Sequence, residues 1–171
     1  MTSVYGKASS LAERRMQPSE LLTVKESAGR ILYVEDDEDT RELVTCVMTM
    51  NNYRIAAAEN CHDALMLARS NEFDLYLIDN WMAECSGIDL CEKLREFDPF
   101  VPILFYSGAA YEHDRQRAFA AGAQGYLVKP VDNDELLKQL SRLISAARRT
   151  QSVTEYKFQG SQIKNLPSNE E

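Results

Sequence analysis

Short apolar segments alternate with amphipathic stretches between residues 31 and 148. The segments "ILYV" (31–34), "DLYLID" (74–79), "VPILFYS" (101–107) and "GYLVKP" (125–130) predict buried strands, and "YRIAAA" (53–58) predicts a weaker one. Apolar positions at helical spacing predict helices over 40–50, 62–71, 88–97, 113–123 and 134–148. Because the strands are continuously apolar, we expect an α/β fold with a parallel sheet covered on both faces.

Local signals set the limits of several helices. Asp39 is expected to open the first helix, with Glu42 placed for a capping box. Asp98 and Pro99 stop the third helix, and Gly122 closes the fourth. Five strands that alternate with five helices imply right-handed crossovers.

The two flanks differ from the middle of the chain. Residues 1–28 and 149–171 are rich in Ser, Gln, Asn, Glu and Lys and show little periodicity. We expect a flexible N-terminal extension over 1–28, one domain over 29–148, and a mostly disordered tail over 149–171. The segment "VTEYKF" (153–158) alternates well enough to form a strand if it docks on a sheet edge.

Charge is unevenly distributed in this chain of 171 residues with a formal net charge of −8. Residues 31–147 carry 10 basic and 21 acidic groups, which leaves −11 in the middle. An acidic body argues against direct nucleic-acid binding and is compatible with a cation or a basic partner. The chain has no apolar run near the length of a membrane span and no signal peptide, so we expect a cytoplasmic protein without membrane insertion.

The four cysteines do not form a metal-binding pattern. Cys46, Cys61, Cys85 and Cys91 show no C-x-x-C spacing, and two histidines are too few to complete a zinc site. We therefore expect the cysteines to be small core residues, apart from Cys85, which we expect to be an unreactive loop residue.

Polar side chains gather where the predicted strands end. Glu35 and Asp36 follow the first strand, Asp79 ends the third, Ser107 the fourth and Lys129 the fifth. Ligands of open parallel sheets lie at this edge. Carboxylates there suit Mg²⁺, and a lysine with a hydroxyl suits phosphoryl oxygens. The set suggests phosphoryl transfer to a carboxylate, with the centrally placed Asp79 as the best nucleophile.

Four motifs in this order resemble the receiver domain of two-component response regulators, in particular single-domain, chemotaxis-regulator-like members, over about residues 29–148. They are "ILYVEDDEDTREL", "DLYLIDNWMAECSGIDLCEKLR", "VPILFYSGA" and "GAQGYLVKP". Arg41 matches the family's arginine five residues after the second acid, which selects Glu35 and Asp36 as the acidic pair. Gly87 matches a glycine eight residues after the acceptor. The resemblance implies a flavodoxin-like, doubly wound sheet of five parallel strands in the order 2-1-3-4-5, with five helices.

The resemblance also implies a Mg²⁺-dependent phosphoacceptor. Asp79 would take a phosphoryl group from the phosphohistidine of a sensor histidine kinase or a histidine phosphotransfer protein. Mg²⁺ would be bound by Asp36, Asp79 and the Trp81 carbonyl, with Glu35 acting through water. By the same resemblance, the chain is no enzyme beyond its self-phosphorylation and autodephosphorylation.

The remaining implied roles concern phosphate binding and switching. Lys129 and Ser107, which stands where most members have threonine, would hold the phosphoryl oxygens, and a cis bond is expected before Pro130. Ser107 and Tyr126 would act as the switch. They would remodel the face of the fourth helix, fifth strand and fifth helix, where a downstream protein binds. A phosphorylation-dependent dimer is left open.

Three departures from the family pattern bear on the site. Ala83 replaces a usual proline, so the loop after Asp79 should be less stiff. Trp81 could shield the acyl phosphate, and Ala109 offers no carboxylate to orient water. We expect slow autodephosphorylation, and Trp81→Asn should accelerate it.

Other interpretations of the same residues exist. Glu35 and Asp36 could only cap a helix, and Tyr126 could only fill the core. A haloacid-dehalogenase-like phosphatase needs a second acid where Trp81 stands, and "EDDED" would repel the phosphate of a flavodoxin-like nucleotide binder. A phosphorylation-independent interaction module and a receiver excised from a larger regulator both remain as alternatives.

Overall fold

The computed structural model describes residues 27–163 of the chain, and the side chains of residues 27–152. Five parallel strands form one sheet in the order β2-β1-β3-β4-β5, which confirms the predicted topology. The strands are β1 (Gly29–Val34), β2 (Tyr53–Ala58), β3 (Leu75–Ile78), β4 (Ile103–Ser107) and β5 (Gly125–Val128).

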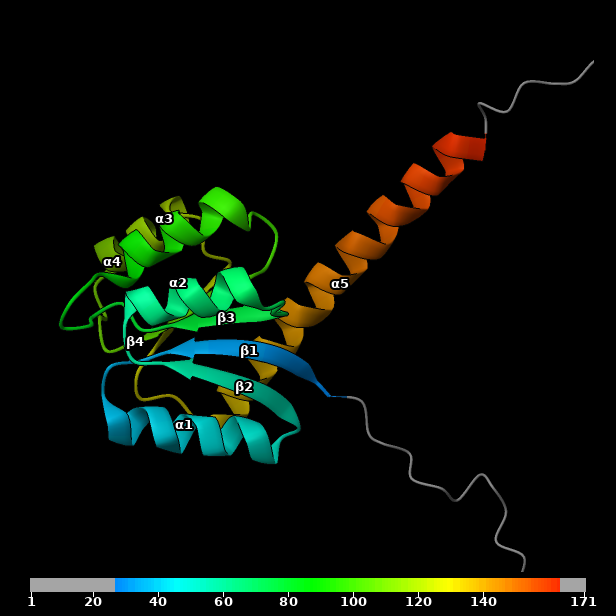
Figure 1. The fold of residues 1–171 in the computed structure, drawn as a ribbon. Helices are drawn as coiled ribbons and strands as arrows, with labels where there is room; N and C mark the ends of the chain where they lie inside the picture. The colour runs from blue at the N-terminus through cyan, green and yellow to red at the C-terminus, as the bar shows by residue number, and fades with distance from the viewer. Residues whose placement is uncertain (1–26, 164–171) are drawn as a thin grey trace, which may run out of the picture.

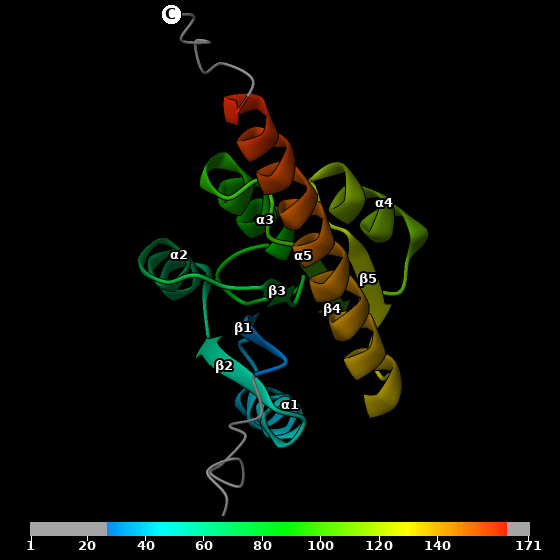
Figure 2. The ribbon, with the colours of Figure 1, turned by 90° about the vertical axis from the view of Figure 1, so that its right-hand side faces the viewer.

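Helices cover both faces of this sheet (Figures 1 and 2). Side chains of α1 (Glu38–Met50) and α5 (Asn133–Ile163) pack on one face. Side chains of α2 (Cys61–Ser70), α3 (Gly87–Phe97) and α4 (Glu112–Ala120) pack on the other. The arrangement confirms the predicted flavodoxin-like, doubly wound fold.

Burial on both faces explains why the strand segments are apolar throughout. Every residue of β3 and β4 is buried. Along β1, Leu32 and Val34 face the core beneath α2 and α3, whereas Ile31 and Tyr33 face the core beneath α1 and α5. Strand residues alternate between two cores rather than between a core and solvent.

The first helix begins earlier than predicted. Asp37, and not Asp39, is the N-cap of α1, and its side chain accepts a hydrogen bond of 2.8 Å from the Thr40 amide. The run of acids offers several candidate caps, and β1 ends early enough for Asp37 to reach the first free amide. Gly122 follows α4 with a φ of 105°, in agreement with the predicted closure by glycine.

The last helix extends well past its predicted end at Arg148. α5 continues to Ile163 and runs out beyond the sheet (Figure 1). The expectation of disorder over 149–163 and of a strand over 153–158 is therefore wrong. At the start of this extension Arg148 pairs with Asp74 at 2.9 Å, and the hydroxyl of Ser152 donates to the Arg148 carbonyl at 2.8 Å. Residues 1–26 and 164–171 lie outside the described residues, so the predictions of a flexible extension and of a disordered end stay predictions.

Three of the cysteines depart from the expectation of small core residues, because Cys46 is exposed on α1 and the other two form a disulfide. Cys61 and Cys85 form a disulfide between the start of α2 and the loop before α3, so Cys85 is not a free loop residue. Local sequence spacing does not predict this pairing, because the two residues are 24 positions apart and meet only when α2 and α3 pack on the same face. Cys91 is a buried core thiol, as expected.

Over the described residues, 27–163, no helix is both long enough and apolar enough to cross a membrane.

Candidate functional site

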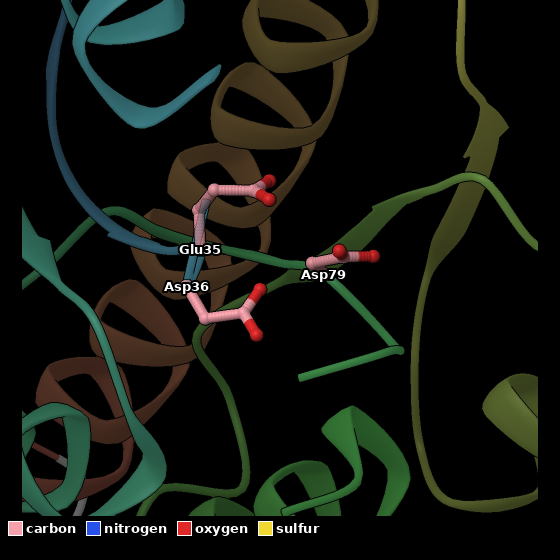
Figure 3. Close-up of side chains that lie close together, drawn as sticks. All are labelled: Glu35, Asp36 and Asp79. Atoms are coloured by element: carbon pink, nitrogen blue, oxygen red, sulfur yellow. The ribbon is translucent and has the colours of Figure 1, made fainter. Parts of the chain in front are cut away.

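Three carboxylates meet at the carboxyl edge of the sheet. Glu35 and Asp36 follow β1, and Asp79 follows the neighbouring β3, whose Ile78 is in register with Val34. One oxygen from each carboxylate lies within 4.8 Å of the others (Figure 3). The parallel pairing of β1 and β3 brings together acids that lie more than forty positions apart in the sequence.

Glu35 is the most deeply buried of the three, at 2% exposure. Its Oε2 accepts a hydrogen bond of 2.9 Å from the Tyr33 hydroxyl and also pairs with the Lys129 ammonium. Burial raises the pKa of Glu35, whereas the hydrogen bonds from Lys129 and Tyr33 and the charge of Lys129 oppose that rise. Burial next to this carboxylate also raises the pKa of Tyr33, so its hydroxyl remains a donor.

Lys129 connects two of the acids from the end of β5. Its ammonium lies 3.5 Å from Asp79 Oδ2 in addition to its contact with Glu35, and 5.2 Å from the centre of the Tyr106 ring. The side chain is 19% exposed. Three carboxylates and one ammonium leave two formal negative charges, which one divalent cation would neutralise.

Asp36 is exposed, and both its side chain and its backbone carbonyl accept hydrogen bonds. Its Oδ2 accepts a hydrogen bond of 2.8 Å from the Ala83 amide. The Arg41 guanidinium binds the carbonyl oxygens of Glu35 and Asp36 at 2.7 and 3.1 Å. Arg41, used above only to align the motif, therefore holds the backbone that carries both acids.

Asp79 is positioned mainly by backbone contacts. Its amide donates to the Val34 carbonyl at 2.9 Å, and its Oδ1 accepts from the Trp81 amide at 3.4 Å. Gly87 packs directly against this turn, because a Cβ there would lie 2.2 Å from the Asp79 carbonyl oxygen and 2.8 Å from Asn80 Cα. Residue 87 must be glycine for the turn after Asp79 to close in this way.

Residues 80–86 form the loop between Asp79 and α3, which we call the acceptor loop. Trp81 and Ser86 form an antiparallel bridge across it. Trp81 is 67% exposed. Its roles as a carbonyl ligand and as a shield of the acyl phosphate stay predictions.

The two predicted switch residues share a backbone neighbour. Ser107 is fully buried, and its Oγ accepts a long hydrogen bond of 3.4 Å from the Ala109 amide. The Tyr126 hydroxyl donates to the Ala109 carbonyl at 2.9 Å, and its ring stacks on Phe105 at 5.8 Å. The Lys129–Pro130 bond is cis, as expected.

Sequence reasoning missed two groups that contact the acids. Tyr33 stands two positions before Glu35, and the alternation along a strand could have indicated that both point to one face. The Ala83 amide contacts Asp36 through the backbone, so no side-chain pattern could have pointed to it.

The set of donors suits a hard divalent cation. All three clustered side chains offer oxygen ligands, Asp36 is open to solvent, and the remaining charge is negative. The arrangement fits Mg²⁺ retaining several waters.

Comparisons with known proteins agree with this geometry. The sequence model of the response regulator receiver domain family matches residues 31–141 of the chain. The transcriptional regulatory protein ZraR of Salmonella typhimurium is 34% identical over 120 residues, which are 70% of this chain and 27% of that protein. ResD of Bacillus subtilis is 31% identical over 121 residues, which are 71% of this chain and 50% of that protein. The chain thus spans between about a quarter and a half of these relatives.

Solved structures of response regulators also resemble the chain. The chemotaxis response regulator CheY4 of Vibrio cholerae superimposes with a TM-score of 0.63 and 29% identity, covering 67% of this chain and 97% of that one. The non-phosphorylated HemR receiver domain of Leptospira biflexa gives a TM-score of 0.64 and 35% identity, covering 68% and 94%. The chain belongs to the response regulator receiver domain family.

Proposed function

We propose that this chain is the phosphoacceptor module of a two-component or phosphorelay system, with Asp79 as the acceptor. The observation that carries the proposal is the meeting of three carboxylates and one lysine at a single sheet edge. A phosphoacceptor role fits the receiver family.

The proposed step is an in-line transfer. A carboxylate oxygen of Asp79 attacks the phosphorus of a phosphohistidine on a sensor histidine kinase or a phosphotransfer protein. A P–O bond forms and the P–N bond breaks, and the imidazole nitrogen takes the electron pair and then a proton. Lys129, already 3.5 Å from Asp79, and the Ser107 hydroxyl would bind the phosphoryl oxygens.

Receiver domains generally bind Mg²⁺. In this chain Asp36, Asp79 and the Trp81 carbonyl would hold the ion, and Glu35 would contact it through water. The ion would offset the charge on the phosphoryl oxygens and on the acids around them. Glu35 pairs with Lys129, which suits it to a supporting position.

Receiver domains interact with histidine kinases and with downstream effectors. For this chain we propose output through the face of α4, β5 and α5, controlled by Ser107 and Tyr126. This face carries exposed apolar side chains at Phe119 and Val128. We further propose a cytoplasmic location and no catalysis on any separate substrate. The relatives are longer regulators, so a receiver acting within such a regulator fits equally well.

The test is an intact-mass measurement after incubation with acetyl phosphate, with and without Mg²⁺, on the wild type and on Asp79→Asn. We expect one phosphoryl adduct that needs Mg²⁺ and is absent from the variant. A folded wild type that forms no adduct and binds no beryllofluoride would overturn the proposal in favour of a phosphorylation-independent interaction module.

A further inference from the structure

The Cys61–Cys85 disulfide joins the acceptor loop to the start of α2. Cys61 is the first residue of α2, directly after the Asn60 N-cap, whose side chain accepts from the Asp63 amide at 2.9 Å. Ala64, one turn into the helix, is fully buried in the core. The start of α2 is therefore held in place by the core, and the disulfide restrains the acceptor loop relative to it.

The same loop carries two groups that contact the acidic site. The Ala83 amide donates to Asp36 Oδ2 at 2.8 Å, and the Trp81 amide donates to Asp79 Oδ1 at 3.4 Å. Cys85 lies two residues after Ala83 and next to Ser86, which bridges back to Trp81. A covalent restraint at Cys85 consequently limits where both amides can lie.

We propose that Cys61 and Cys85 are a reversible redox pair and that their disulfide holds the acceptor loop in the conformation that binds Mg²⁺ and accepts the phosphoryl group. The inference rests on the proposed function of Asp79. Ala83 lacks the φ restriction of a proline, so the disulfide adds a covalent restraint to the hydrogen bonds that hold this loop. Reduction would release the loop and weaken the site.

The oxidant we assign is a low-molecular-weight disulfide of the glutathione type. One cysteine thiolate attacks a sulfur of the oxidant, a mixed disulfide forms, and one small thiolate leaves. The second cysteine thiolate then attacks the protein sulfur and expels the second small thiolate. The two protons of the cysteine thiols pass to the released thiolates, and the protein loses two electrons. A dithiol reverses both steps.

The pair is partly accessible to solvent, on the side of Cys85. Cys61 and Cys85 are both half-buried, and Cys85 lines a surface hollow of about 190 Å³ beside Asp36 and Asn60. Cys91 contrasts with them, since it is fully buried, donates to the Ala121 carbonyl at 3.3 Å, and burial raises the pKa of its thiol to about 11. In the cytoplasmic location proposed above, most disulfides are transient and act in catalysis or redox sensing, which fits a reversible pair.

The first part of the test is whether the bond forms and breaks. The full chain is equilibrated with oxidised glutathione or with dithiothreitol and is then alkylated in denaturant. Of the four cysteines, two are free, so we expect two labelled thiols in the oxidised protein and four in the reduced protein. Four labelled thiols after oxidation would overturn the inference.

The second part is whether the bond controls the site. Trp81 is the one tryptophan of the chain and lies in the acceptor loop, so its fluorescence can report a Mg²⁺ titration without any phosphorylation. On reduction we expect Mg²⁺ affinity and the rate of phosphorylation by acetyl phosphate each to fall about five- to thirtyfold, because ordering the backbone of one loop residue costs a free energy that corresponds to a factor of this size.

Matched variants separate the possible causes. Cys61→Ser and Cys85→Ser should behave as the reduced wild type under all conditions, whereas Cys46→Ser, which alters an exposed free thiol on α1, should keep the redox response. Equal Mg²⁺ binding and equal phosphorylation in both redox states would refute the redox inference and leave the phosphoacceptor intact. Absence of phosphorylation in both states would refute the proposed function and, with it, this inference.

Discussion

Replacement of Gly87 by alanine is the sharpest test of how the fold positions the acceptor. An ideal Cβ at this position lies 2.2 Å from the Asp79 carbonyl oxygen and 2.8 Å from Asn80 Cα. Both are backbone atoms, which cannot rotate away as the end of a side chain could. Restoring an ordinary contact of about 3.4 Å requires the turn after Asp79 to move by about 1 Å.

The displacement should lower both stability and phosphorylation. Forcing an extra carbon into a packed site costs about 1–3 kcal/mol, which corresponds to a melting temperature lower by about 3–9 °C in a chain of this size. A shift of about 1 Å at a reacting carboxylate can slow a reaction by about a hundredfold. Urea unfolding and the rate of phosphorylation by acetyl phosphate measure the two effects separately.

Gly108→Ala is the matched control, because a Cβ at Gly108 meets no atom within 4 Å. It lies at the same sheet edge, next to Ser107, and should leave the free energy of unfolding unchanged within about 0.5 kcal/mol. If Gly87→Ala unfolds at the wild-type midpoint and is phosphorylated at the wild-type rate, Gly87 does not position Asp79 as the structure indicates.

Further predictions concern the groups around the acids. Tyr33→Phe removes the hydroxyl that donates to Glu35 and should lower the free energy of unfolding by about 1.5 kcal/mol at pH 7, measured in urea; an unchanged value would mean that the bond is not formed in solution. Glu35 has a folded-state pKa above its ordinary value of 4.5, so its contribution to stability is full below pH 4.5 and is lost as pH rises through the folded pKa. In EDTA, the stability of the wild type relative to Glu35→Gln should therefore fall above pH 4.5, and a constant difference would contradict the raised pKa. Trp81→Asn should shorten the life of the acyl phosphate, followed by the decay of the phosphoryl mass, whereas Trp81→Phe should preserve it; equal decay in all three proteins would dismiss the shielding hypothesis.

The fold was predictable because its signals are local and repeated. Continuous apolar segments that alternate with helical periodicity determine the parallel sheet, and the prediction even of the weak "YRIAAA" strand is confirmed as β2. The errors occur where local signals are degenerate. Five consecutive acids offer several caps, and the structure uses Asp37 rather than Asp39. The sequence carries no stop signal that places the end of α5, which continues past Arg148 to Ile163.

Of the candidate site, only the residues that stand at the ends of strands could be predicted from the sequence. Glu35, Asp36, Asp79 and Lys129 lie together because parallel strands end at one edge, and this much follows from the pattern. Residue types do not predict contacts made by the backbone, such as the hydrogen bond from the Ala83 amide to Asp36. The pairing of Cys61 with Cys85 depends on which helices share a face, which spacing alone does not give.

The position of Ala109 suggests how a charge at Asp79 could reach the proposed output face. Its amide is bound by the Ser107 hydroxyl oxygen at 3.4 Å, and its carbonyl accepts from the Tyr126 hydroxyl at 2.9 Å. Rotation of Ser107 toward a phosphoryl oxygen would release the Ala109 amide, and the peptide that follows could then turn away from Tyr126. The long bond is the weaker of the two, so it should break first. The backbone of one alanine thus couples the two side chains.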